Sequence, residues 1–184
     1  MNSFVSLLRG VNVSGHNVIR MAELKALYES LGLADVSTYI QSGNVVFRAR
    51  RNNPGVLGSL IERAIGERFG FPVVVLLRRP AELARIIKNS PFIGREKIDE
   101  QRLYVTFLKT RPSALAVGAA KDAAAKSPDQ YEIAGSEIYL HCPHGYGKTL
   151  LSNTFFEKQL KVMATTRNWR TVMTLHAMAS GANR

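Results

Sequence analysis

The order of strand-like and helix-like segments in residues 1–79 constrains the fold more than any other feature of this sequence. Short apolar runs typical of strands alternate with stretches whose apolar residues recur at i, i+3, i+4 and i+7, the spacing of a helix. The predicted segments, in order, are a strand Phe4–Leu8, a helix through Leu24, Leu27, Tyr28 and Leu31, strands Val36–Gln41 and Val45–Arg48, a helix that closes at Gly70, and a strand Val73–Leu77.

Turn and cap residues support these boundaries. Ser42-Gly43-Asn44 lies between the two middle strands, and this composition tolerates a positive φ. Asn53 can cap the second helix, with Pro54 at its first position. The order β-α-β-β-α-β is that of the ferredoxin-like α-β plait, so an α+β class is expected.

Residues 80–184 repeat this pattern less completely. The predicted segments are a helix Pro80–Lys88, a strand Leu103–Leu108, a helix Ser113–Lys126, a hairpin of Gln130–Ile133 with Glu137–His141, and two closing helices at Lys148–Leu160 and Asn168–Ala179. This is a plait-like subdomain without its last strand and with extra C-terminal helices. We therefore expect one subdomain at 1–79 and a second at 80–184, divided at the Arg79-Pro80 step.

The net charge of +11 favours an anionic partner, because basic side chains attract phosphates and carboxylates. The charge is unevenly placed, with net +5 in residues 1–80, +1 in 81–147 and +5 in 148–184. The single Cys142 excludes an internal disulfide and favours a reducing, cytoplasmic location. We expect no signal peptide at the N-terminus and no membrane-spanning segment, because no apolar run reaches the roughly 20 residues required.

Two polar loops are predicted to meet at one edge of the first sheet. The loop after the first strand and the turn after the second emerge at the same edge of a β-α-β-β-α-β plait. Their candidate ligand-binding residues are Arg9, Asn12, Gln41, Ser42 and Asn44, with Ser14 and His16 beside them. The guanidinium would bind a carboxylate or phosphate, and the amides can donate or accept. The alternative is that the glycines and asparagines only shape the loops.

Arg167 and Asn168 form a second candidate site before the last helix. Thr166 or Asn168 can cap that helix, which would leave N–H groups and a positive dipole end beside Arg167. The alternative is a simple cap with Trp169 packed against the core. If this helix end faces the first subdomain, Arg9 and Arg167 would share one anion.

Arginine clusters support a nucleic-acid-binding alternative. They consist of Arg48, Arg50 and Arg51, and of Arg78 and Arg79. Base stacking in the manner of an RNA-recognition motif is not expected, because Phe4 and Phe47 are the only aromatic residues on the relevant strands. These arginines are equally consistent with solvated loops.

Other motifs match known sites only in part. Gly147-Lys148-Thr149 resembles the end of a phosphate-binding loop, but Cys142 stands where its first glycine should be. His141, Cys142 and His144 lack the further ligands of a metal site, so neither a metal nor a cofactor is expected. The polar edge contains no Asp or Glu for acid–base catalysis. Whether the chain is an enzyme is left open.

Three separated motifs carry a family resemblance. LLRGVNVSG at 7–15, TYIQSGNVVF at 38–47 and TTRNWRTV at 165–172 resemble the bacterial family catalogued as domain of unknown function 1697. The resemblance implies two α-β plait subdomains and supplies no reaction, cofactor or catalytic residue. The leading hypothesis is a protein that binds an anionic small molecule. Nucleic-acid binding and an enzyme acting on a small anionic metabolite are the alternatives, and the oligomeric state stays open.

Overall fold

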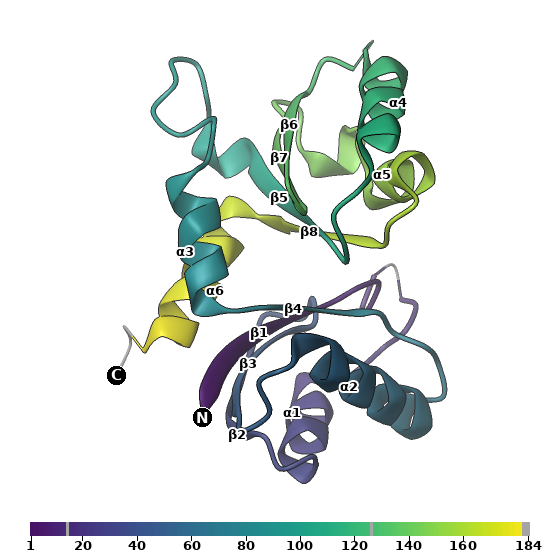
Figure 1. The fold of residues 1–184 in the computed structure, drawn as a ribbon, viewed down its shortest axis with the longest axis vertical. Coiled ribbons are helices and arrows are strands. Elements are labelled where there is room, and N and C mark those ends of the chain that lie inside the picture. The colour runs from purple at the N-terminus through teal and green to yellow at the C-terminus, as the bar shows by residue number, and fades with distance from the viewer. Residues whose placement is uncertain (14, 126, 182–184) are drawn as a thin grey trace. The chain divides into compact units, whose positions relative to one another are not determined.

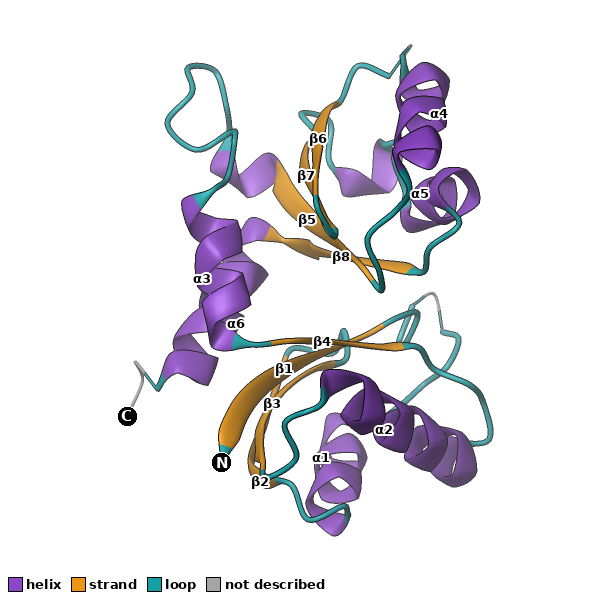
Figure 2. Ribbon diagram, in the orientation of Figure 1, coloured by secondary structure: helices purple, strands orange, loops and turns teal. Residues whose placement is uncertain are grey.

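The computed structural model describes residues 1–13, 15–125 and 127–181 and has an α+β architecture (Figures 1 and 2). The chain divides into two units. Unit 1 consists of Met1–Arg85 with Thr174–Arg184, and unit 2 of Ile86–Met173. Each unit contains a four-stranded antiparallel sheet. The subdomain ranges 1–79 and 80–184 stay a prediction.

Unit 1 begins with the element order expected from the sequence. Its elements are β1 (Asn2–Leu8), α1 (Met21–Ser30), β2 (Ala34–Tyr39), β3 (Asn44–Ala49), α2 (Pro54–Phe69), β4 (Val75–Arg78) and the start of α3 (Pro80–Lys88). The strand order across the sheet is β2-β3-β1-β4, so β2 and β4 are the edge strands.

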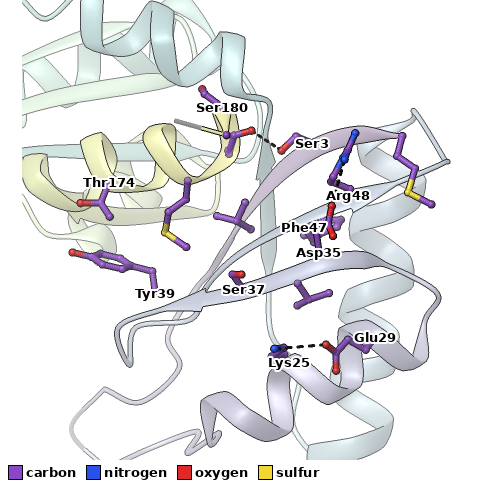
Figure 3. Close-up of a pocket in the computed structure, with 16 residues that line it drawn as sticks. Ser3, Lys25, Glu29, Asp35, Ser37, Tyr39, Phe47, Arg48, Thr174 and Ser180 are labelled. Carbon is purple, nitrogen blue, oxygen red and sulfur yellow. Dashed lines mark hydrogen bonds and ion pairs between the residues drawn. The ribbon is translucent and has the colours of Figure 1, made fainter. Parts of the chain in front are cut away.

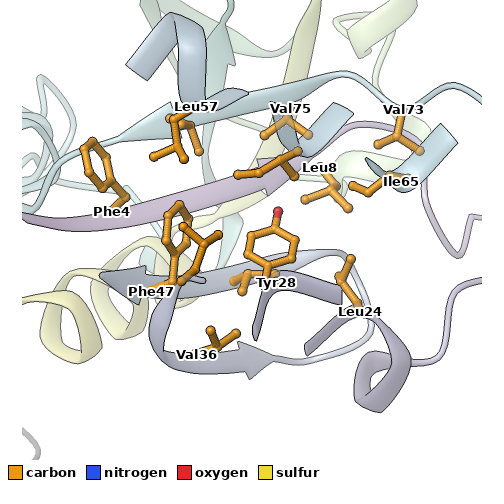
Figure 4. Close-up of a cluster of buried hydrophobic side chains, with 14 of the residues drawn as sticks. Phe4, Leu8, Leu24, Tyr28, Val36, Phe47, Leu57, Ile65, Val73 and Val75 are labelled. Carbon is orange, nitrogen blue, oxygen red and sulfur yellow. The ribbon is translucent and has the colours of Figure 1, made fainter. Parts of the chain in front are cut away.

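The core of unit 1 lies between one sheet face and helices α1 and α2 (Figure 4). Side chains of a strand alternate between its two faces, so Phe4 and Phe47, which are register partners, both point into this core. Their rings stack with centroids 5.8 Å apart, and Tyr28 meets Phe47 edge-on at 5.4 Å. The Tyr28 hydroxyl shares a 2.8 Å hydrogen bond with Ser6 Oγ, which satisfies two polar groups inside the core.

The ends of α2 form as its sequence predicts. Asn53 Oδ1 accepts a hydrogen bond from Val56 N at 3.2 Å, and Pro54 occupies the first turn. Gly70 ends the helix in the left-handed region at φ 79°.

Unit 2 contains the other sheet. Its elements are the end of α3, the 3₁₀ turn η1 (Glu100–Arg102), β5 (Leu103–Leu108), α4 (Ala114–Ala124), β6 (Gln130–Ala134), β7 (Glu137–His141), the 3₁₀ turn η2 (Tyr146–Lys148), α5 (Asn153–Leu160), β8 (Ala164–Asn168) and the start of α6 (Trp169–Ser180). Its strand order is β6-β7-β5-β8. Its core, which includes Phe156 and Leu140, lies between this sheet and helices α4 and α5.

The prediction that the second sheet lacks its last strand is wrong. β8 pairs antiparallel with β5 along Ala164–Asn168. Its sequence, ATTRN, is short and mostly polar, so it carries little apolar signal. β-branched threonine nevertheless suits a strand, and Thr165 is buried.

The helix expected at Lys148–Leu160 is shorter than predicted. Residues 146–148 form only the turn η2, and α5 starts after Ser152, whose Oγ accepts from Phe155 N at 3.2 Å. Gly147-Lys148-Thr149 therefore does not open a helix. Lys126, at the predicted end of α4, lies outside the described residues. Within the described part of the chain, no helix has the length and apolar character needed to cross a membrane.

Candidate functional site

Asn12 joins the two polar loops of unit 1. Its side-chain Nδ2 donates to Gln41 O at 2.7 Å and to Ile19 O at 2.9 Å, while its Oδ1 accepts from Ile19 N at 2.8 Å. The structure thus brings the loop after β1 against the turn after β2. The amide of Asn12 is used to hold backbone groups, a role that the sequence left as an alternative to ligand binding.

Asn44 has a similar role in the adjacent turn. It is fully buried, and its Nδ2 donates to Tyr39 O at 3.1 Å and Ser42 Oγ at 2.8 Å. Arg9 is half-buried, whereas the side chain of Gln41 is exposed. Ser14 lies outside the described residues. Two of the five residues predicted at this edge therefore organise the loops.

Arg167 and Asn168 belong to unit 2. Asn168 Oδ1 accepts from Thr171 N at 2.8 Å, so Asn168 is the cap, and Trp169 is buried. The Arg167 side chain is also buried, and its Nη1 donates to Thr165 Oγ1 at 2.7 Å and Thr166 O at 2.9 Å. Burial lowers the pKa of Arg167 to about 10 because it disfavours the charged guanidinium.

A hydroxyl network that the sequence did not reveal holds the third motif in place. Thr166 Oγ1 donates to Asn153 Oδ1 at 2.6 Å and accepts from Tyr146 at 3.0 Å. It also shares a 2.6 Å hydrogen bond with Thr106 Oγ1. Burial raises the pKa of Tyr146, which keeps the phenol protonated. The hydrogen bonds of Thr166 to Tyr146 and Asn153 therefore hold β8 against η2 and α5.

The five arginines of the nucleic-acid alternative differ in exposure and in their partners. Arg50 and Arg51 are exposed, but Arg78 is buried, with Nη1 donating to Leu77 O. Arg79 donates to Asn52 O at 2.8 Å and lies over the Phe4 ring at 5.6 Å. Arg48 forms an ion pair with Asp35.

His141 and Cys142 lie on opposite faces of the second sheet, as expected for adjacent strand residues. Cys142 belongs to the core of unit 2, and burial raises the pKa of its thiol to about 11. The His141 ring lies 6.3 Å from the Phe92 ring. The described residues contain no group of three metal-ligating side chains.

A cavity of unit 1 lies elsewhere, along edge strand β2 (Figure 3). This edge-strand cavity has a volume of about 970 Å³. Its lining combines hydroxyl groups, charged groups and a few apolar side chains, namely Met1, Ser3, Lys25, Glu29, Asp35, Val36, Ser37, Tyr39, Val46, Phe47, Arg48, Thr174, Met178, Ala179, Ser180 and Gly181.

The cavity includes both faces of β2. Ser37 lies opposite Val46 in the register and points to the sheet face where Thr174 and Met178 of α6 form a wall. Val36 points the other way, into the core beneath α1. Ser3 Oγ donates to Ala179 O at 2.9 Å, which ties the end of α6 to β1 above the cavity.

Each side of the strand carries one ion pair. Arg48 Nη1 lies 3.3 Å from Asp35 Oδ2, and Lys25 Nζ lies 3.8 Å from Glu29 Oε1 on α1. All four side chains are between 43% and 52% exposed. Ion pairs between such exposed side chains are weak, because water screens the charges.

Comparison with known proteins agrees with the sequence motifs. The model of a family described as "Protein of unknown function (DUF1697)" matches residues 1–139. The chain belongs to the DUF1697 family. No curated protein matches it. Among solved structures, it is similar to conserved bacterial protein SP0830 from Streptococcus pneumoniae, with a TM-score of 0.71 at 22% sequence identity over 97% of this chain and 98% of that chain.

In this DUF1697 member, the matched range contains the motifs at 7–15 and 38–47 but not the one at 165–172. Most of the edge-strand cavity lies in that range, but the residues from α6 follow it. Sequence reasoning missed the cavity, which depends on the position of β2 at the edge of the sheet. Nothing in the sequence indicated that α6 would form a wall of this cavity, because residues 174–181 are distant from β2 in the chain.

Proposed function

We propose that this protein binds a small ligand that carries both a positive and a negative group, and that the ligand lies in the edge-strand cavity of unit 1. The observation that carries the proposal is one cavity with a cation–anion pair on each side of a strand. A carboxylate of the ligand would bind Arg48 or Lys25, and an ammonium group would bind Asp35 or Glu29. The surrounding hydroxyls of Ser37, Tyr39 and Thr174 would add hydrogen bonds.

Cavity size and composition support this proposal. Sites for small ligands usually occupy roughly 300–1,000 Å³ and combine apolar surface with a few polar groups. The apolar surface here comes from Val46 and Met178. The balance of two acids and two bases makes a ligand with both charges a better match than a simple anion.

A blocking variant tests the site. Ser37 is exposed on the cavity side of β2, so Ser37→Trp would obstruct the cavity without entering the core. Thr154→Trp, at an exposed position of α5 and outside this cavity, is the control. We expect amino acids or dipeptides screened by NMR to shift cavity resonances in wild type and Thr154→Trp but not in Ser37→Trp. Equal binding by all three proteins would place the site elsewhere, and no binding by wild type would reject the proposal.

The anionic small molecule at the polar loop edge remains a second proposal. It is supported by the meeting of the two loops at Asn12 and Gln41. Arg9 would be the anion contact, with the exposed side chain of Gln41 beside it. An enzyme acting on a small anionic metabolite at this edge stays a prediction that a substrate screen would test.

Nucleic-acid binding keeps support from one groove. Arg51, Ser59 and Arg63 line a groove of about 530 Å³ beside the start of α2, and its described lining contains no acid. Phosphate contacts there would give an affinity that falls steeply with salt. Fluorescence anisotropy with single-stranded and duplex oligonucleotides tests it, because absence of binding at low salt would reject this function.

We also propose that both units are ferredoxin-like plaits. The support comes from the strand orders β2-β3-β1-β4 and β6-β7-β5-β8. In each sheet the first strand of the unit lies between its third and fourth strands, and the second strand lies at an edge. A cytoplasmic location remains the expectation from the single cysteine.

A further inference from the structure

Strand β2 has an outer edge that pairs with no other described strand. It lies at the end of the sheet order β2-β3-β1-β4 and pairs only with β3. An edge strand presents backbone N–H and C=O groups that can pair with another extended chain. The edge-strand cavity adjoins this edge along Asp35, Val36, Ser37 and Tyr39.

The cavity has the shape that an added strand would need. Side chains of a strand alternate between two faces, so an extended peptide beside β2 would send residues to both sides of the sheet. The described cavity opens on both sides, toward α6 and Arg48 on one and toward Lys25 and Glu29 of α1 on the other (Figure 3). A compact small molecule would occupy only one of these sides.

Backbone geometry limits where pairing can occur. The β2–β3 register shifts between Ala34 and Ser37, and Asp35 has a left-handed φ of 51°. This irregularity belongs to the start of the strand, where Asp35 meets Arg48. From Ser37 to Tyr39 the register is regular, which leaves a straight edge of three residues.

Charge complementarity indicates the chemistry of the partner. Each side of β2 offers one cation and one anion, and all four side chains are about half exposed. A peptide with both acidic and basic side chains can satisfy both sides at once, since alternate residues reach opposite faces.

We propose that the ligand of the edge-strand cavity is an extended peptide of mixed charge that adds a strand to β2. This inference rests on the proposed function and specifies its ligand class. Backbone hydrogen bonds to the Ser37–Tyr39 edge provide the main attachment, and the two ion pairs select the side chains. A peptide of a few residues suits a cavity of about 970 Å³.

The test uses the full chain and a displayed library of random octapeptides. The strongest binder is synthesised with blocked ends and measured by isothermal titration calorimetry. Two further versions carry N-methyl groups on alternate backbone amides, one on the odd and one on the even residues. Because alternate amides of a strand point to opposite edges, we expect one version to lose affinity about tenfold or more and the other to bind nearly as well as the parent.

Protein variants link this binding to β2. We expect Ser37→Trp to abolish peptide binding and Thr154→Trp to preserve it. Equal affinity of the two N-methylated versions overturns strand addition, as does failure of every peptide when a single amino acid still binds at the cavity. That last result leaves the proposed function intact, whereas failure of peptides and amino acids alike rejects both. A dimer in sedimentation analysis that Ser37→Trp dissociates would assign the edge to a second copy and also overturn the peptide proposal.

Discussion

The two units share the backbone hydrogen bonds at the ends of their first strands but differ in the turns and loops around them. Leu8 N donates to Gly43 O in unit 1, and Leu108 N donates to Ser136 O in unit 2, both at 2.9 Å. The next residues repeat the pattern, with Arg9 N bonded to Val74 O and Lys109 N to Met163 O. The shared ladder therefore fixes the sheet, while the turns and loops around it distinguish the units.

The hairpin glycines illustrate this difference. Gly43 and Gly135 both have left-handed φ values, 70° and 67°. A Cβ at Gly43 would overlap Val11 Cγ2 and lie 2.8 Å from Leu8 Cβ, whereas a Cβ at Gly135 would meet nothing within 4 Å. Unit 1 thus packs a loop against its turn, and unit 2 leaves the same turn open.

The largest predicted effect comes from replacing these glycines by alanine. Gly43→Ala combines backbone strain with overpacking and should lower the free energy of unfolding by about 3 kcal/mol. Gly135→Ala adds only the strain, about 1 kcal/mol. Urea denaturation measures both, and equal losses would contradict the crowding at Gly43.

Asn12 provides the second test, because the loop of unit 2 after β5 has no equivalent residue. Asn12→Asp keeps a side chain that tolerates the φ of 55° but replaces the two N–H donations with repulsion between oxygens. We expect a loss of about 2 kcal/mol in urea denaturation. Asn17→Asp is the control, since Asn17 also has a positive φ but its side chain makes one exposed hydrogen bond within the described residues, to Gly10 O, and it should lose well under half as much. A similar loss in both variants would show that the hydrogen bonds of Asn12 contribute no more to stability than the exposed hydrogen bond of Asn17.

The sequence predicted more of unit 1 than of unit 2 for a physical reason. In unit 1, the Asn53 cap and Gly70 indicated the ends of α2, and the structure has them. The strands predicted at Val36–Gln41 and Val73–Leu77 are also present, but β2 begins two residues earlier and β4 two residues later than predicted. In unit 2, β8 combines polar threonines with a buried arginine, so its strand character comes from pairing with β5. The meeting of two polar loops followed from topology. The edge-strand cavity did not, because its wall depends on where α6 packs.

Cys142, the single cysteine of the sequence, makes the stability of unit 2 depend on pH, and unit 1 contains no cysteine that could do the same. Burial raises the pKa of Cys142 from 9.0 to about 11, so between these values the folded chain holds a proton that the unfolded chain releases. Stability from this group is complete below pH 9 and is lost as the pH rises toward 11, by about 2 kcal/mol at most. The difference in unfolding free energy between wild type and Cys142→Ala should follow this course. Rapid reaction of the native thiol with a disulfide reagent at pH 8 would contradict it.

The smallest effect tests the equivalence of the units. Asn53 of unit 1 and Ser152 of unit 2 cap the second helices, each by a 3.2 Å hydrogen bond to the N–H three residues on. Asn53→Ala and Ser152→Ala should each lower the unfolding free energy by about 1 kcal/mol. Thermal denaturation followed by circular dichroism measures both. A loss in only one of the two variants would show that caps of the same geometry contribute differently to the free energy of unfolding.

Helix α6 has a consequence for the order in which the protein is made. Its first residues belong to unit 2 and its last to unit 1, where Ala179 accepts the Ser3 hydrogen bond 176 positions away in the chain. A ribosome releases residues 174–181 only after all of unit 2 has been translated. The sheet of the first unit can therefore form early in synthesis, whereas the wall of its cavity is completed only after unit 2 has been made.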